Sequence, residues 1–291
     1  MRLPVALALL ALLALLCLYR YSSATMAASG AVAAAATAAA ATAAPGLSSL
    51  IFLHGLGDSG AGWAFLRGEL SPRFPRMRFA FPNSPTQPVT LAGGEAMPSW
   101  MDLDDLPVTA RTPEDREGYE ASTKLVHALI DREVAAGVPA NRIFLGGFSQ
   151  GACGPAGRHV PALPGVPGLS CAHPAPTATF PALNHLPPAG GSMSLYAGLK
   201  YPQLLGGIVC FSGWLPQKLW DAELSKLPSA AATKFLLVHG SQDSKVAFER
   251  GTTARDLLQQ RAPKGAVTFI QFPGDHTLHP PSIESLAQFM A

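Results

Sequence analysis

Charged side chains are scarce in this chain of 291 residues. They account for 14% of the sequence, whereas an average soluble domain carries roughly 25%. The formal net charge is only +2, and the basic residues form none of the dense patches that mark a nucleic-acid-binding surface. We therefore expect no nucleic acid among the partners of this protein.

Cysteine is scarce as well. The four cysteines stand at positions 17, 153, 171 and 210, and no two of them form a C-x-x-C pair. Structural zinc sites and disulfide-stapled scaffolds both depend on closely spaced cysteines. The sequence therefore predicts neither, and the 48% of apolar residues must supply the stability through a hydrophobic core.

Residues 1–47 show no pattern of a folded core. Residues 3–19 are an apolar run of 17 residues between Arg2 and Arg20, which fits a signal peptide or a short signal anchor. We treat 1–25 as that candidate and the Ala-rich segment 26–47 as a linker. The protein is then membrane-associated or secretory. If translation instead starts at Met26, the apolar run is never made and the protein is cytoplasmic.

From Ser48 to Ala291, short apolar runs alternate with longer segments of helical periodicity. This alternation predicts one α/β domain, a mostly parallel sheet with helices on both faces. Functional residues of such sheets lie on loops beyond the carboxyl ends of the strands. We expect strands at 49–55, 77–81, 142–146, 207–211, 234–238 and 267–272, and helices at 118–136, 247–260 and 282–290.

A G-x-S-x-G motif, Gly147-Phe148-Ser149-Gln150-Gly151, follows one of the predicted strands. A serine between a strand and a helix is typical of the nucleophile elbow, a strained turn that lifts the hydroxyl clear of the sheet. Glycines flank such a turn because side chains there would clash. Ser149 is therefore the candidate nucleophile. An ordinary glycine turn with an incidental serine is the alternative.

A serine hydroxyl becomes a good nucleophile only when a base takes its proton and an acid orients that base. In folds with a nucleophile elbow the chain order is serine, acid, histidine. Asp243 and His276 follow the last two predicted strands in that order. We expect them to complete a triad with Ser149, and His279 is the competitor of His276.

The transition state of acyl transfer carries an oxyanion, which needs two N–H donors aimed at one point. One donor should be the N–H of Gln150, the residue after the nucleophile, and the other should come from the loop after an early strand. The glycine-rich loop at 54–58 follows the first predicted strand, and Leu56 N–H is its candidate. The alternative is again an ordinary glycine turn.

Five segments together resemble the acyl-protein thioesterase family, also called lysophospholipase-like carboxylesterases, within the α/β-hydrolases. The resemblance covers residues 48–291 apart from one block. The segments are IFLHGLGDSGAGW (51–63), PVTLAGGEAMPSWMDL (88–103), ALIDREVAAGVPANRIFLGGFSQG (128–151), SLYAGLKYPQLLGGIVCFSGWLP (194–216) and HGSQD (239–243).

The resemblance implies a serine hydrolase that acts on thioesters of S-acylated proteins and on lysophospholipids. It implies the triad and oxyanion donors named above. It also assigns the loop 83–100 to the acyl channel, with Trp100 and Met97 binding substrate. No metal or organic cofactor is implied. A carboxylesterase or lysophospholipase for small lipids is the alternative.

Two departures from the family pattern stand out. The segment between the last predicted strand and His276 is one residue shorter than usual. More conspicuously, residues 152–190 interrupt the helix expected after the elbow with 39 residues that include nine prolines. Each proline inside a helix costs about 3 kcal/mol, so this block is not helical. The family pattern resumes at Gly191.

The insertion has two interpretations. It is either a lid or partner-binding loop, or, as we favour, a retained intron, because its removal restores GFSQG-GSMSLYAG in frame. The insertion begins two residues after Ser149, inside the first turn of the expected helix. Because errors of about 1 Å at a catalytic group can cost about 10²-fold in rate, we predict that the uninterrupted form is far more active. A catalytically impaired product, or a membrane-tethered binding module, is the corresponding alternative.

Overall fold

The computed structural model describes residues 46–148 and 190–291. The signal or anchor candidate 1–25, nearly all of the linker, Ser149, Gln150 and almost the whole insertion lie outside the described residues. Residues Ser48–Ala291 form one compact unit, and the fold is that of this unit. None of the helices in the described ranges is long and apolar enough to cross a membrane.

Within the described ranges, the central sheet has six strands in the order β2-β1-β5-β6-β7-β8, and every neighbouring pair is parallel. Their carboxyl ends therefore meet at one edge, which is where functional loops of such sheets lie. The strands are β1 Ser48–Leu53, β2 Met77–Ala80, β5 Ile143–Phe148, β6 Gly207–Phe211, β7 Phe235–Gly240 and β8 Val267–Phe272.

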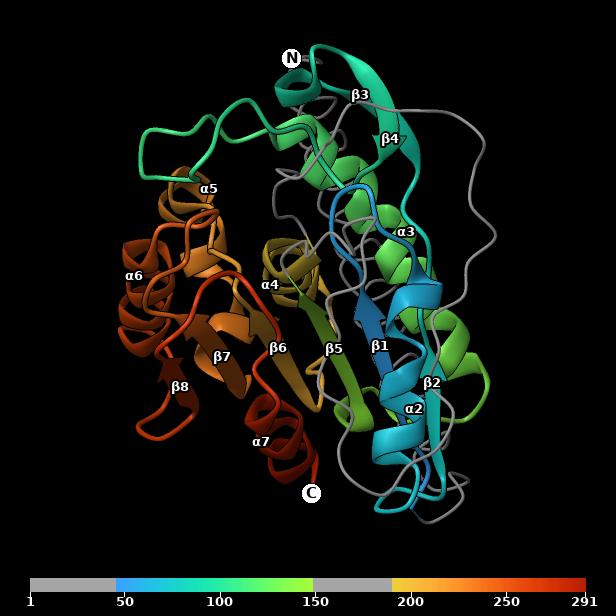
Figure 1. Ribbon diagram of the computed structural model, residues 1–291. Helices are drawn as coiled ribbons and strands as arrows, with labels where there is room; N and C mark the ends of the chain where they lie inside the picture. Colours follow the sequence, from blue (N-terminus) through green and yellow to red (C-terminus); the bar gives the residue numbers. More distant parts are fainter. Residues whose placement is uncertain (1–45, 149–189) are drawn as a thin grey trace, which may run out of the picture. The chain divides into compact units, whose positions relative to one another are not determined.

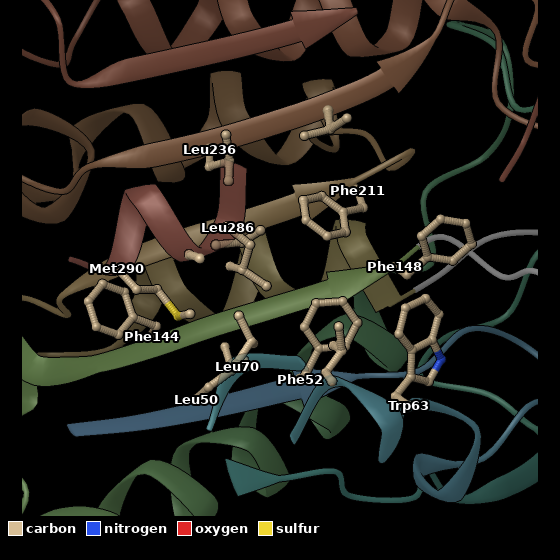
Figure 2. Close-up of a cluster of buried hydrophobic side chains, with 14 of the residues drawn as sticks. Leu50, Phe52, Trp63, Leu70, Phe144, Phe148, Phe211, Leu236, Leu286 and Met290 are labelled. Carbon is tan, nitrogen blue, oxygen red and sulfur yellow. The ribbon is translucent and has the colours of Figure 1, made fainter. Parts of the chain in front are cut away.

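Alternate strand residues build the core on one face of the sheet. Phe52, Phe148 and Phe211 point to the same side, where they pack with Trp63 and with residues of α7 (Figure 2). Burial of such apolar surface contributes about 25 cal/mol per Å². The two helices that close this core are α2 Phe65–Leu70 and α7 Pro281–Met290.

Helices α3 (Arg116–Ala135) and α4 (Gly190–Lys200) pack together behind the sheet in Figure 1. Asp115 caps α3, because its side chain accepts a hydrogen bond from Gly118 N–H at 2.9 Å. All but the last residue of α4 are buried. Such complete burial explains why this helix has no polar face. The other two helices are α5 Gln217–Ala222 and α6 Phe248–Gln259.

The predicted fold class is confirmed, and each predicted strand and helix is present within about two residues of its expected bounds. The segment 83–100 differs from the expectation of a long loop. It contains an antiparallel hairpin of β3 Thr86–Val89 and β4 Glu95–Pro98. The turn between them includes Gly93 and Gly94, both with positive φ, a conformation that glycine adopts without strain.

Candidate active site

The loops after β7 and β8 lie against each other at the carboxyl edge of the sheet. A side chain at Gly240 would overlap the carbonyl groups of Gly274 and Asp275, so only glycine allows this close approach. Asp243 lies on the first loop and His276 on the second. Strand β5 ends beside them at Phe148, directly before Ser149, which is outside the described residues.

Asp243 and His276 form a hydrogen-bonded pair. His276 Nδ1 lies 2.7 Å from Asp243 Oδ2. The other carboxylate oxygen, Oδ1, accepts the backbone N–H groups of Lys245 at 2.9 Å and of Val246 at 2.7 Å. The side chain of Asp243 is fully buried and that of His276 is 4% exposed. The carboxylate is thus held rigidly, and it fixes the orientation of the imidazole ring.

The second ring nitrogen of His276 has no partner in the described part of the chain. Nε2 is buried and makes no hydrogen bond there. The ring contacts Phe148, with 5.5 Å between ring centroids. A buried polar atom without a hydrogen bond is costly. We therefore expect a hydrogen-bond donor near Nε2, close to the end of β5.

His279, the competing histidine, lies elsewhere. Its ring stacks on Phe272, with centroids 4.6 Å apart and ring planes 6° from parallel. The structure therefore brings His276, and not His279, to Asp243. His239 lies nearby, with Nε2 3.0 Å from Val246 O and 3.4 Å from Asp243 Oδ2, and burial lowers its pKa.

The loop expected to hold the oxyanion follows β1. Leu56 is buried, and among the described residues its N–H donates to no acceptor. Gly57 has a φ of 72° and donates its N–H to Pro98 O at 2.7 Å. The glycine thus permits the turn that leaves Leu56 N–H available.

The hairpin β3–β4 packs on this loop. Leu56 forms a small apolar cluster with Val89 and Met97, and Leu91 and Ala92 pack against its side. Met97 is therefore a neighbour of the expected oxyanion donor. The hairpin turn is held by Asp102, which accepts hydrogen bonds from Thr90 N and Thr90 Oγ1 at 2.7 and 2.5 Å.

His54 ties the loop to the rest of the site. Its Nδ1 lies 2.5 Å from Gly55 O, and its Nε2 accepts the N–H of Ser84 at 2.9 Å. Trp100, which is 1% exposed, donates its indole N–H to His54 O at 2.8 Å. Burial lowers the pKa of His54, which favours the neutral ring whose Nε2 can accept from Ser84. The hydrogen bond from Trp100 to His54 O thus helps to fix the loop after β1.

Residues 11–187 and 188–291 match the sequence profile of the Phospholipase/Carboxylesterase family of α/β-hydrolases. The chain belongs to this family. It is 33% identical over 245 residues to a probable carboxylesterase of Oryza sativa subsp. japonica, covering 84% of this chain and 76% of the relative. It is 36% identical over 230 residues to acyl-protein thioesterase 1 of Yarrowia lipolytica, covering 78% of this chain and 83% of the relative.

Solved structures agree with the family. The crystal structure of SOBER1 from Arabidopsis thaliana superposes with a TM-score of 0.64 at 27% sequence identity, covering 84% of this chain and 97% of that chain. The family makes this protein an enzyme of the serine hydrolase type. In the described part of the chain, no three His, Cys, Asp or Glu side chains gather as metal ligands.

Sequence analysis missed Asp275, the residue before His276. Its carboxylate accepts the N–H groups of Ser244 and His276, both at 2.7 Å, and Ser244 Oγ at 3.1 Å. Burial alone would raise the pKa of Asp275, but these hydrogen bonds lower it. Asp275 thus joins the loops of Asp243 and His276. The only signal in the sequence is its place in the shortened segment before the histidine.

Proposed function

We propose that this protein is an acyl-protein thioesterase in which Ser149, His276 and Asp243 form the catalytic triad. The observation that carries the proposal is the unpartnered Nε2 of His276. It lies on a ring that contacts Phe148, the residue before Ser149, while Nδ1 is bound to Asp243. A serine hydroxyl at the next position is the donor that this nitrogen lacks.

The reaction proceeds in two halves. Ser149 Oγ attacks the carbonyl carbon of a thioester while His276 Nε2 takes the hydroxyl proton. Leu56 N–H and Gln150 N–H stabilise the resulting oxyanion. The tetrahedral intermediate then collapses, the thiolate leaves with the proton from His276, and the acyl group remains on Ser149. His276 next takes a proton from a water molecule as the water oxygen attacks the acyl carbon. The second tetrahedral intermediate then expels Ser149 Oγ, which takes the proton back from His276, and the fatty acid is released.

The proposed substrates are S-acylated proteins, with Met97 and Trp100 in the region that receives the acyl chain. The support is the similarity to acyl-protein thioesterase 1 of Yarrowia lipolytica and the apolar cluster that Leu56 forms with Val89 and Met97 at the oxyanion loop. The name of the rice relative favours the second candidate, a carboxylesterase or lysophospholipase for small lipids. Membrane association through residues 3–19 stays a prediction.

Covalent labelling tests the proposal. The full chain and a variant lacking 152–190 are treated with a fluorophosphonate, with Ser149→Ala as the blank. We expect labelling that disappears in the blank. Hydrolysis of a palmitoyl-cysteine peptide is then compared with hydrolysis of a lysophospholipid. Labelling that persists in Ser149→Ala would refute the assigned nucleophile, and a preference for the lysophospholipid would favour the second candidate.

A further inference from the structure

Helix α4 begins against the ends of two strands. A methyl group at Gly190 would lie under 3.0 Å from three backbone oxygens, those of Leu53, His54 and Phe148. Leu53 and Phe148 are the last residues of β1 and β5. Backbone atoms cannot swing aside as the end of a flexible side chain can, so glycine is required at position 190.

The first glycine of the elbow motif faces the same point. A methyl group at Gly147 would overlap the carbonyl of Gly190 and reach the N of Gly191 at 3.0 Å. Gly147, near the end of β5, and Gly190, the first residue of α4, thus pack backbone against backbone. A nucleophile elbow joins a strand to a helix in a sharp turn, and the glycines on either side of its serine allow the two to approach this closely. In the sequence, the last glycine of the motif is Gly151.

Helix α4 is held in place by hydrogen bonds to the elements around it. Side chains and carbonyls along the helix are bonded to α3, to β6 and to the 3₁₀ turn Pro228–Ala231. The bonds are Ser192 Oγ with Tyr119 Oη, Ser194 Oγ to Val209 O at 2.7 Å, His127 Nε2 with Ala197 O at 2.9 Å, and Ser229 Oγ to Leu199 O. These contacts fix where Gly190 lies.

We propose that Gly190 is a positioning residue that performs the packing role assigned by the motif to its last glycine. The inference rests on the proposed function, because the elbow it supports is that of Ser149. Gly190 keeps the end of β5 and the oxyanion loop at the spacing that the nucleophile needs. In a chain lacking 152–190, Gly151 directly precedes Gly191 and inherits this role.

The test asks whether glycine is required at position 190 in the full chain and at position 151 in the variant lacking 152–190. Gly190→Ala and Gly151→Ala are made in the full chain, and Gly151→Ala is also made in the variant lacking 152–190. Gly68→Ala is the matched control, because a methyl group there meets nothing within 4 Å. The measurements are the fluorophosphonate labelling rate, kcat and KM for p-nitrophenyl butyrate, and the thermal midpoint.

We expect Gly190→Ala to lower kcat and the labelling rate about 10²-fold at unchanged KM, and to lower the midpoint by about 5 °C. Gly151→Ala should match Gly68→Ala in the full chain but lose about 10²-fold in the shortened variant. A purely structural residue would lower the midpoint without lowering the labelling rate of the folded protein.

Two results overturn the inference when the full chain is labelled. One is a Gly190→Ala protein that is labelled as fast as Gly68→Ala, whatever its thermal midpoint, and the other is a full chain in which Gly151→Ala alone loses activity. If only the shortened variant is labelled, the full chain has no positioned nucleophile for Gly190 to support, and the inference is overturned while the proposed function stands. If neither parent labels, the proposed function itself fails and the positioning role falls with it.

Discussion

The two halves of the candidate site are built differently. The loops after β7 and β8 are joined by side chains, since Asp243 binds His276 and Asp275 binds Ser244. The end of β5 and the start of α4 instead pack backbone against backbone at Gly147 and Gly190. The backbone contact tolerates no added atom, although it does not require that its glycines be close in the chain.

The largest effect should come from breaking the acid–base pair. We expect His276→Ala to lower kcat about 10⁴-fold or more, because it removes the proton acceptor of the serine. His279→Ala is the control and should keep nearly full activity, since that ring stacks on Phe272. Steady-state kinetics on a p-nitrophenyl ester measures both. Equal losses in the two variants would contradict the assignment of the base.

Removing residues 152–190 tests the other half of the candidate site, the junction between β5 and α4. We expect the shortened variant to have a kcat about 10²-fold above that of the full chain, because the nucleophile is then followed directly by α4. Active-site titration with a fluorophosphonate separates a change in rate from a change in the fraction of competent enzyme. Equal turnover by both forms would show that the insertion is harmless to catalysis.

A smaller effect should follow from Asp275→Ala. The variant loses the bonds that hold the loop of His276 to Ser244, so we expect a loss of about tenfold in kcat, less than that from displacing the nucleophile. Asp256→Ala is the control, because the side chain of Asp256 is exposed and, among the described residues, forms an ion pair only with the neighbouring Arg255. If both variants retain wild-type kcat, the loops need no such bridge.

The smallest predicted effect concerns pH. Burial lowers the pKa of His54 and of His239 below the ordinary 6.5, so the unfolded chain takes up protons that the folded protein does not. The free energy of unfolding should therefore be greatest above pH 6.5 and should decrease as the pH falls below it. Urea unfolding between about pH 5 and pH 8 measures this slope.

His54→Gln isolates the contribution of one of these histidines. The amide oxygen can still accept the Ser84 N–H, but the side chain no longer titrates. We expect a shallower decline in stability at acid pH, with the slope that remains coming from His239. A slope unchanged by the substitution would mean that His54 takes up its proton equally in both states.

Much of the fold follows from the sequence because the strands are short apolar runs bounded by turn residues. The predicted bounds 207–211 and 267–272 match β6 and β8. The hairpin β3–β4 was missed because Gly93, Gly94 and two prolines give its segment the composition of a loop. The hairpin packs on Leu56 through Val89 and Met97, and such a tertiary contact can override local propensity.

The candidate site divides in the same way. Motif and chain order indicated Asp243 and favoured His276 over His279, and the structure places His276 Nδ1 2.7 Å from Asp243 Oδ2. The bond between His54 and Ser84 joins residues 30 positions apart, and nothing in the local pattern indicates it. The hydrogen bonds of Asp275 form because the loops after β7 and β8 meet at Gly240. That meeting follows from the order of the strands in the sheet, which the local sequence does not indicate.

The contact between the end of β5 and the start of α4 also bears on how fast the chain folds. In an uninterrupted chain this contact is local and forms early. Here 41 residues separate Phe148 from Gly190, so the contact must wait for a loop of that length to close. The entropic cost grows only as the logarithm of loop length, whereas folding rates fall steeply as contacts become more distant in sequence. The insertion should therefore slow refolding more than it weakens the folded protein.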